Sequence, residues 1–72
     1  MTVKSVKTVF DIQQVLKGFG TIIYTGNRLA DLELMEEELR ELFQTKLIDV
    51  KVFQQALLLL KSEQEKEKRK NN

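Results

Sequence analysis

Three stretches of the chain repeat apolar residues every three or four positions, the spacing that gathers them on one face of an α-helix. These stretches cover residues 9–19, 29–43 and 50–60. Polar and charged residues occupy most of the positions between the apolar ones. The pattern therefore predicts three amphipathic helices, each of which needs the other two to bury its apolar face.

The start of the first helix has two interpretations. Thr8 can cap it, because its hydroxyl can accept a backbone N–H while Asp11, three residues on, reaches back to the cap. Asp11 as the cap, with Gln14 at the third position, fits almost equally well. Gly18 and Gly20 are expected to end the helix, because glycine readily adopts the left-handed conformation that closes one.

The segment 21–25 is β-branched and aromatic, so its intrinsic preference is for a β-strand. The chain contains no second strand-like run that could pair with it. We therefore predict an extended or one-turn connector whose isoleucines cover the end of a helical bundle. Gly26 and Asn27 follow as turn and cap for a second helix over residues 28–44.

Asp49 is the expected cap of the third helix, which starts at about residue 50. Short connections favour antiparallel neighbours, so the fold class predicted is all-α, a small three-helix bundle. The expected divisions are a flexible N-terminal segment (1–7), the three-helix domain (8–61) and a charged C-terminal tail (62–72). From residue 61 the chain is almost wholly polar, and we expect the helix to fray there.

The composition removes much chemistry from consideration. The 72 residues include no Cys and no His, which excludes disulfides, zinc sites with those ligands and imidazole or thiol catalysis. We expect no enzyme, because so short a chain can hardly enclose a dry pocket for its few remaining reactive groups, and we expect no cofactor. The longest uninterrupted apolar run, residues 56–60, is far shorter than the ~20 residues that span a bilayer, and the N-terminus lacks the apolar core of a signal peptide. A cytoplasmic protein with no membrane partner is predicted.

The net charge of +1 hides an uneven distribution. Residues 1–28 carry four basic side chains against one acidic one, whereas residues 29–44 carry six acidic side chains against one basic one. Glu33, Glu37 and Glu41 form an i, i+4 row on the second helix. A solvated acidic face explains this row better than a metal site, because a hard cation needs oxygens wrapped around it. The row can also bind a basic protein partner.

The turn before the second helix offers a possible anion site. Unpaired N–H groups at a helix start, here next to Gly26 and Asn27, attract phosphate or carboxylate groups, and the Arg28 guanidinium can add charge and hydrogen bonds. The alternative is that this Gly-Asn turn only caps the helix.

Lys17, Tyr24 and Arg28 supply the two components of single-stranded nucleic-acid binding. Bases stack on aromatic rings, and cations follow the phosphates. Phe19 completes the first apolar stripe and is expected in the core, which leaves Tyr24 as the stacking residue.

Leu34 and Leu58 lie off the main apolar stripes of their helices. They are either two scattered surface leucines or a contact that makes a weak homodimer. We expect a monomer or a weak homodimer.

Several blocks of the sequence resemble the YqgQ-like family of small bacterial proteins. They are residues 10–17, residues 20–28 with Ile22-Ile23-Tyr24-Thr25-Gly26 followed by Asn27-Arg28, then Asp31, residues 35–42 and residues 47–48. The resemblance covers about residues 8–61. It implies a cytoplasmic three-helix protein of unassigned role and no known enzymatic activity, for which single-stranded nucleic-acid binding has been suggested. The chain departs from the pattern at Phe19 and Phe43, where tyrosine is common, and at Asn27, where aspartate is.

The sequence therefore favours a non-catalytic binding module for single-stranded nucleic acid. Lys17, Tyr24 and Arg28 would contact the ligand, with Gly26 and Asn27 at the anion-binding helix start. The alternative is a protein-interaction adaptor that uses the acidic face of the second helix or an apolar patch near Leu58.

Overall fold

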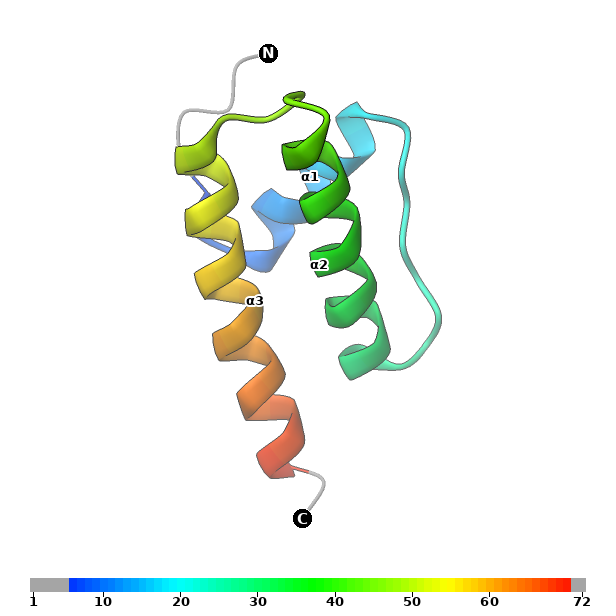
Figure 1. Ribbon diagram of the computed structural model, residues 1–72. Helices are drawn as coiled ribbons and strands as arrows, with labels where there is room; N and C mark the ends of the chain where they lie inside the picture. Colours follow the sequence, from blue (N-terminus) through cyan, green and yellow to red (C-terminus); the bar gives the residue numbers. More distant parts are fainter. Residues whose placement is uncertain (1–5, 71–72) are drawn as a thin grey trace.

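The computed structural model describes residues 6–70, which form three α-helices and, within that range, no β-strand. The helices are α1 (Val9–Gly18), α2 (Arg28–Gln44) and α3 (Val50–Lys70). Figure 1 shows α2 and α3 side by side and antiparallel, with α1 crossing behind them. The predicted all-α three-helix bundle is confirmed.

Helix α1 begins with a complete capping box. The Thr8 hydroxyl accepts the Asp11 N–H at 3.2 Å, and the Asp11 carboxylate accepts the Thr8 N–H at 3.1 Å. The same carboxylate accepts the Lys7 N–H at 3.0 Å. Thr8 is therefore the cap, and the alternative that starts the helix at Asp11 is wrong. These bonds satisfy donors that a helix start leaves open, and they lower the pKa of Asp11, with the Lys7 bond as the largest contribution.

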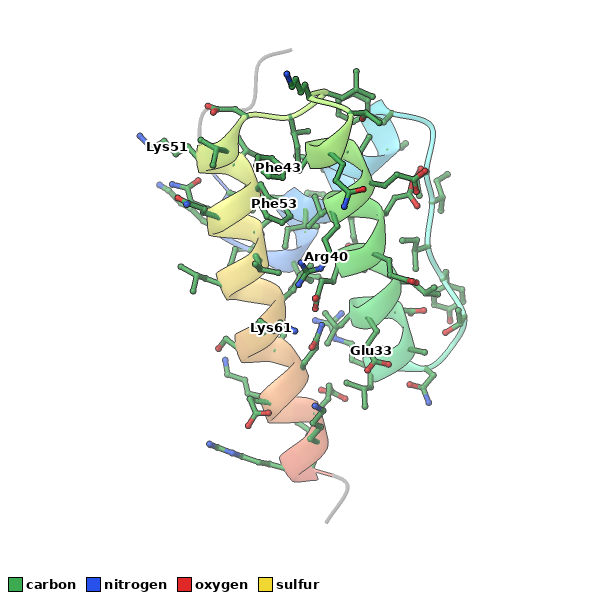
Figure 2. All side chains as sticks on the ribbon, viewed as in Figure 1. Glu33, Arg40, Phe43, Lys51, Phe53 and Lys61 are labelled. Atoms are coloured by element: carbon green, nitrogen blue, oxygen red, sulfur yellow. The ribbon has the colours of Figure 1, made fainter. Side chains whose placement is uncertain are left out.

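The apolar faces of the three helices meet in one core. Its fully buried side chains come from all three helices and are Ile12, Leu16, Leu32, Met35, Leu39 and Leu60. At the end of the bundle near the α2–α3 turn, the rings of Phe43 and Phe53 stack with centroids 4.4 Å apart (Figure 2). The i, i+3, i+4 spacing in the sequence thus located the core.

Two apolar residues expected in the core are exposed instead. Phe19 has 44% of its surface exposed because it is the C-cap residue of α1, where the chain turns away and carries its side chain off the helix stripe. Val50 is 49% exposed at the first position of α3. In both cases the apolar spacing includes a residue at a helix end, and that residue is exposed instead of buried.

A flexible N-terminal segment was predicted for residues 1–7. Residues 1–5 of it lie outside the described residues. Val6, however, is 5% exposed, packs in the core and donates its N–H to the Gln55 side chain of α3 at 3.1 Å. The ordered domain therefore includes Val6, two residues before the predicted start at residue 8.

Helix α3 also continues beyond the predicted start of fraying, through the charged segment 62–70. Two contacts with α2 explain the difference. Gln64 is 5% exposed and donates to Glu36 at 3.0 Å, and Glu63 pairs with Arg28 at 3.7 Å. The i, i+3 pairs Glu63–Lys66 and Glu67–Lys70 add local support. Polar residues that pack against a neighbouring helix hold this part of α3 in place.

Glu36 is the centre of a polar cluster between α2 and α3. Its carboxylate lies 3.1 Å from the Lys61 ammonium, 2.8 Å from the Arg40 guanidinium and 3.0 Å from the Gln64 amide. Arg40 and Lys61 extend from their two helices into the space between them (Figure 2). Burial raises the pKa of Glu36, but the hydrogen bonds from Gln64, Arg40 and Lys61 outweigh it and hold the pKa at about 2.

Candidate nucleic-acid interface at the α1–α2 connector

The connector between α1 and α2 is extended and lies beside α2, on the side away from α3 (Figure 1). It starts at a turn in which Gly20 has a φ of 88° and the Thr21 N–H bonds to the Leu16 carbonyl at 2.9 Å. It ends at Gly26, whose φ is 86°. Because L side chains rarely adopt such φ values, the two glycines fix where the extended segment begins and ends.

Side chains along the connector alternate between exposed and half-buried. Ile22 and Tyr24 are 80% and 85% exposed, whereas Thr21 and Ile23 are half-buried, and Ile23 packs against the core. This period of two is that of an extended chain with one face on the protein. The Tyr24 ring therefore faces solvent, as stacking on a base requires.

A small pocket of about 210 Å³ lies between the connector, α1 and α2. Leu16, Ile23 and Met35 make its apolar part, while Gln13, Gln14 and Lys17 contribute polar groups; Thr21 and Ile22 complete the lining. The sequence predicted Lys17 as a site residue but gave no signal for the two glutamines, which sit on the exposed side of α1. Lys17 forms no ion pair with any of residues 6–70.

The start of α2 is held by two side chains. The Asn27 side chain accepts the Ala30 N–H at 2.9 Å, so Asn27 is the N-cap. Asp31, only 9% exposed, accepts the N–H and the hydroxyl of Thr25 at 2.7 and 2.6 Å. Asp31 thus fastens the connector to α2. The sequence contained no signal for this contact, because a bond across six residues has no periodic signature.

Hydrogen bonds within the protein reduce the number of free N–H donors at the predicted anion site next to Gly26 and Asn27. Of the four N–H groups that a helix start leaves open, those of Asn27 and Ala30 are already used, by the Thr25 hydroxyl and the Asn27 side chain. The buried Asp31 carboxylate also places negative charge near the helix start. The helix start therefore has less to offer an anion than the sequence suggested, and the Arg28 side chain becomes its main cationic group.

Arg28 is shared between the candidate site and α3. Its guanidinium, with a side chain 47% exposed, lies 3.7 Å from the Glu63 carboxylate. The pKa of Glu63 is lowered, chiefly by the hydrogen bond from Lys66, with Arg28 adding a smaller attraction. An exposed pair of this length is weak, so a phosphate can compete with Glu63 for the guanidinium.

The three predicted nucleic-acid contacts lie in a row along the connector. Lys17 precedes the turn at one end, Arg28 begins α2 at the other end, and Tyr24 comes between them along the chain. At ~3.3 Å per residue, an extended chain over residues 20–27 spans roughly 20 Å. The arrangement is therefore linear, as a track for a flexible strand would be, and it does not form one compact cluster.

The acidic face of α2 remains open to solvent. Glu33, Glu37 and Glu41 are exposed, and none of them forms an ion pair within the described part of the chain. Over the same residues, no group of three or more acidic side chains is arranged to hold a metal ion. Among the helices described, none has the length and apolarity needed to cross a membrane.

Comparison with known proteins identifies the family. The YqgQ-like family model matches residues 6–66. An uncharacterized protein of Bacillus subtilis (strain 168), YqgQ, is 39% identical over 61 residues, which cover 85% of this chain and 86% of that protein. No solved structure gives a significant match. With most of its length matched in both comparisons, and with the Ile-Ile-Tyr-Thr-Gly connector among the matched residues, this chain belongs to the YqgQ-like family.

Proposed function

We propose that this protein is a non-catalytic, cytoplasmic module that binds single-stranded nucleic acid along the α1–α2 connector. The observation that carries the proposal is the exposure of Tyr24, 85% of whose surface faces solvent between two cationic side chains. Tyr24 would stack on a base, while Lys17 and Arg28 would each contact a phosphate. No reaction step is involved.

The physical chemistry of the connector supports this ligand class. Stacking on an aromatic ring tolerates any base, and contributes ~1–3 kcal/mol per base in single-strand binding proteins. The exposed Ile22 side chain extends the apolar surface on the same side of the connector. Next to it, the amides of Gln13 and Gln14 can donate to and accept from the edge of an unstacked base.

A double helix fits this surface less well. Duplex readout requires a helix that enters the major groove with side chains for base edges. The exposed face of α2 is acidic and would be repelled by phosphates. The connector presents one aromatic ring and few charges, which suits a strand whose bases are already unpaired.

Fluorescence anisotropy with labelled oligo(dT) and oligo(U) at low salt tests the stacking contact. Tyr24→Ala is expected to weaken binding roughly 5- to 150-fold, the loss of one stacked base. Leu58→Ala is the control, because Leu58 is also exposed, at 73%, but lies on α3, which contributes no residue to the pocket beside the connector. Equal affinity of both variants and the parent protein would contradict the role of Tyr24.

Charge reversal tests the phosphate contacts. With two such contacts, the logarithm of the binding constant should fall with the logarithm of salt concentration with a slope of about −1.4. Lys17→Glu and Arg28→Glu should each lower the affinity and flatten this slope by about half. Lys51→Glu, at an exposed position on α3, is the control. Absence of binding, or binding unchanged by Arg28→Glu, overturns the proposal.

A second candidate is a protein-interaction adaptor that binds a basic partner. It is favoured by the open carboxylates of Glu33, Glu37 and Glu41 and by the 73% exposure of Leu58. A pull-down that recovers one basic protein, withstands nuclease and is lost in a Glu37→Lys, Glu41→Lys double variant would favour the adaptor. Loss of the captured material on nuclease treatment would favour the nucleic-acid ligand.

A further inference from the structure

The backbone of the connector has one edge that is bonded to the protein at its two ends, and a second edge that forms no hydrogen bond with the described residues. The Thr21 N–H donates to Leu16 of α1 at 2.9 Å, and the Thr25 N–H donates to Asp31 of α2 at 2.7 Å. In an extended chain the N–H and C=O groups of alternate residues point to opposite edges. Those of Ile22 and Tyr24 therefore lie on the opposite edge from those of Thr21 and Thr25, and they form no hydrogen bond with any of residues 6–70.

An open strand edge of this kind is usually protected in soluble proteins. Charged side chains, proline or a covering loop prevent it from pairing with another chain. Residues 21–25 contain no charge, the whole sequence contains no proline, and no other described segment covers the outer side of the connector (Figure 1). The edge is thus available, and its side chains are among the strongest strand formers.

The sequence of this edge is complementary to itself. Residues 21–25 read Thr-Ile-Ile-Tyr-Thr, which is nearly the same in both directions. When two copies run antiparallel with Ile23 at the centre, Thr21 lies opposite Thr25, and Ile22 lies opposite Tyr24. Threonine pairs and aromatic pairs with β-branched residues are the cross-strand combinations that stabilise antiparallel sheets.

We propose that two copies of this chain associate through their connectors, which pair as a two-stranded antiparallel ribbon centred on Ile23. The N–H and C=O groups of Ile22 bond to those of Tyr24 in the second copy, and the two-fold axis repeats the exchange, which gives four hydrogen bonds. Ile23 faces its own counterpart as a non-hydrogen-bonded pair. A two-fold contact of this type closes on itself, so association stops at the dimer.

A second copy is the occupant that the structure favours. The chain contains no other strand-like run that could fill the edge. An unrelated peptide would bond equally well to the backbone, but the matched Ile22–Tyr24 and Thr21–Thr25 pairs require this particular sequence on both sides. A ribbon of two short strands is marginal alone, so the dimer is expected to be weak, with a dissociation constant on the order of micromolar to millimolar.

This inference goes beyond the proposed nucleic-acid function and does not depend on it. Pairing places two Tyr24 rings and two Ile22 side chains on one face of the ribbon, whether or not that face binds a base. The dimer is therefore measured without nucleic acid, so its failure and the failure of the proposed function are separate results.

Two double variants with the same number of substitutions test the pairing. Ile22→Lys with Tyr24→Lys places lysine opposite lysine and should abolish the dimer. Ile22→Glu with Tyr24→Lys places glutamate opposite lysine in the antiparallel register and should retain it. Because both positions are at least 80% exposed, the helices should remain intact, and their circular dichroism checks this.

Sedimentation equilibrium over rising protein concentration gives the result. We expect a shift from monomer to dimer mass in the parent protein and in the Glu/Lys variant, and monomer mass in the Lys/Lys variant. Amide exchange at Ile22 and Tyr24 should slow as the concentration rises. Monomer mass at millimolar concentration overturns the proposal, as does a dimer that survives in the Lys/Lys variant. Loss of the dimer in both variants overturns the antiparallel register.

Discussion

The α2–α3 interface and the α1–α2 connector are built in opposite ways. Between α2 and α3, Glu36 is 14% exposed by side chain and bonded to three partners, and even the polar Gln64 is buried. Along the connector, two large apolar side chains face solvent and the outer backbone groups bond to no described residue. At the helix interface these polar groups have hydrogen-bond partners, whereas the connector leaves its outer backbone groups without a partner and exposes the side chains of Ile22 and Tyr24.

The comparison indicates that the α2–α3 interface stabilises the fold, whereas the α1–α2 connector is open to a binding partner. Unpaired backbone groups and exposed aromatic rings add little to a folded monomer, yet they are the groups that bind strands and bases. A small domain has few stabilising contacts to spare, so its fold relies on the interface between its two long helices. Variants in the two regions should therefore have opposite effects on stability and on binding.

The largest effect on stability is expected from the buried face of α2. Leu32 is fully buried, and Leu32→Ala should reduce the free energy of unfolding by ~2–5 kcal/mol because it removes apolar contacts and leaves a cavity. For a domain of this size the loss corresponds to a fall in melting temperature of roughly 10–40 °C. Thermal unfolding followed by circular dichroism measures it.

Leu58→Ala is the matched control, since it makes the same chemical change at a position that is 73% exposed. Its free energy of unfolding should change by less than about 0.5 kcal/mol. Equal losses in the two variants would mean that α2 does not form the core described here.

The next effect concerns the polar cluster at Glu36 and depends on pH. Its pKa of about 2 lies below the ordinary value of 4.5, so the ionised carboxylate stabilises the fold above pH 4.5, and this contribution is lost as the pH falls toward about 2. Glu36→Gln should cost roughly 1–3 kcal/mol near neutral pH, given the partial screening of this group. Urea unfolding over the range from about pH 7 to pH 2 measures the difference from the parent protein.

That difference should shrink as the pH falls from about 5 to 2, because the parent protein then loses the same charge. Glu33→Gln, at an exposed position of the same helix, should produce little change at any pH. A gap between Glu36→Gln and the parent protein that stays constant over this range would contradict the pKa of Glu36.

A smaller effect is expected where the connector is fastened to α2. Asp31→Ala removes the acceptor of two hydrogen bonds from Thr25 and should cost ~1–2 kcal/mol in unfolding free energy. Amide exchange of residues 22–25 should become faster, because the inner edge of the connector is no longer held at that end. Glu33→Ala on the same helix is the control, and unchanged exchange at Thr25 would show that Asp31 does not hold the connector.

The sequence predicted the fold well because each helix carries its own signals. The bounds 28–44 of the second helix and the capping box at Thr8 follow from apolar spacing and local cap chemistry. The end of α3 did not follow, because Gln64 is held by a bond to Glu36, 28 positions earlier in the chain. Val6 escaped prediction for the same reason, since its partner Gln55 is 49 positions away. Contacts between distant residues leave no periodic pattern.

The candidate site was predictable in its residue types but not in its arrangement. The aromatic and basic residues in and beside the connector were evident from the sequence. Tyr24 is exposed, as stacking on a base would require. The pairing of Arg28 with Glu63, the pocket beside Lys17 and the use of Asp31 by Thr25 required the packed helices. What the sequence contained but did not explain was a strand-forming segment without a partner in its own chain.

The smallest effect on stability is expected at the centre of the candidate site. Ile22→Ser with Tyr24→Ser should change the free energy of unfolding by less than about 0.5 kcal/mol, because both side chains already face solvent in the monomer. The same variant should lose binding to oligonucleotides and weaken association between copies, since serine neither stacks on a base nor pairs well across strands. Urea unfolding at low protein concentration, where the chain is monomeric, measures the stability. A loss above 1 kcal/mol would mean that these two side chains belong to the core, and the contrast between connector and helix interface would disappear.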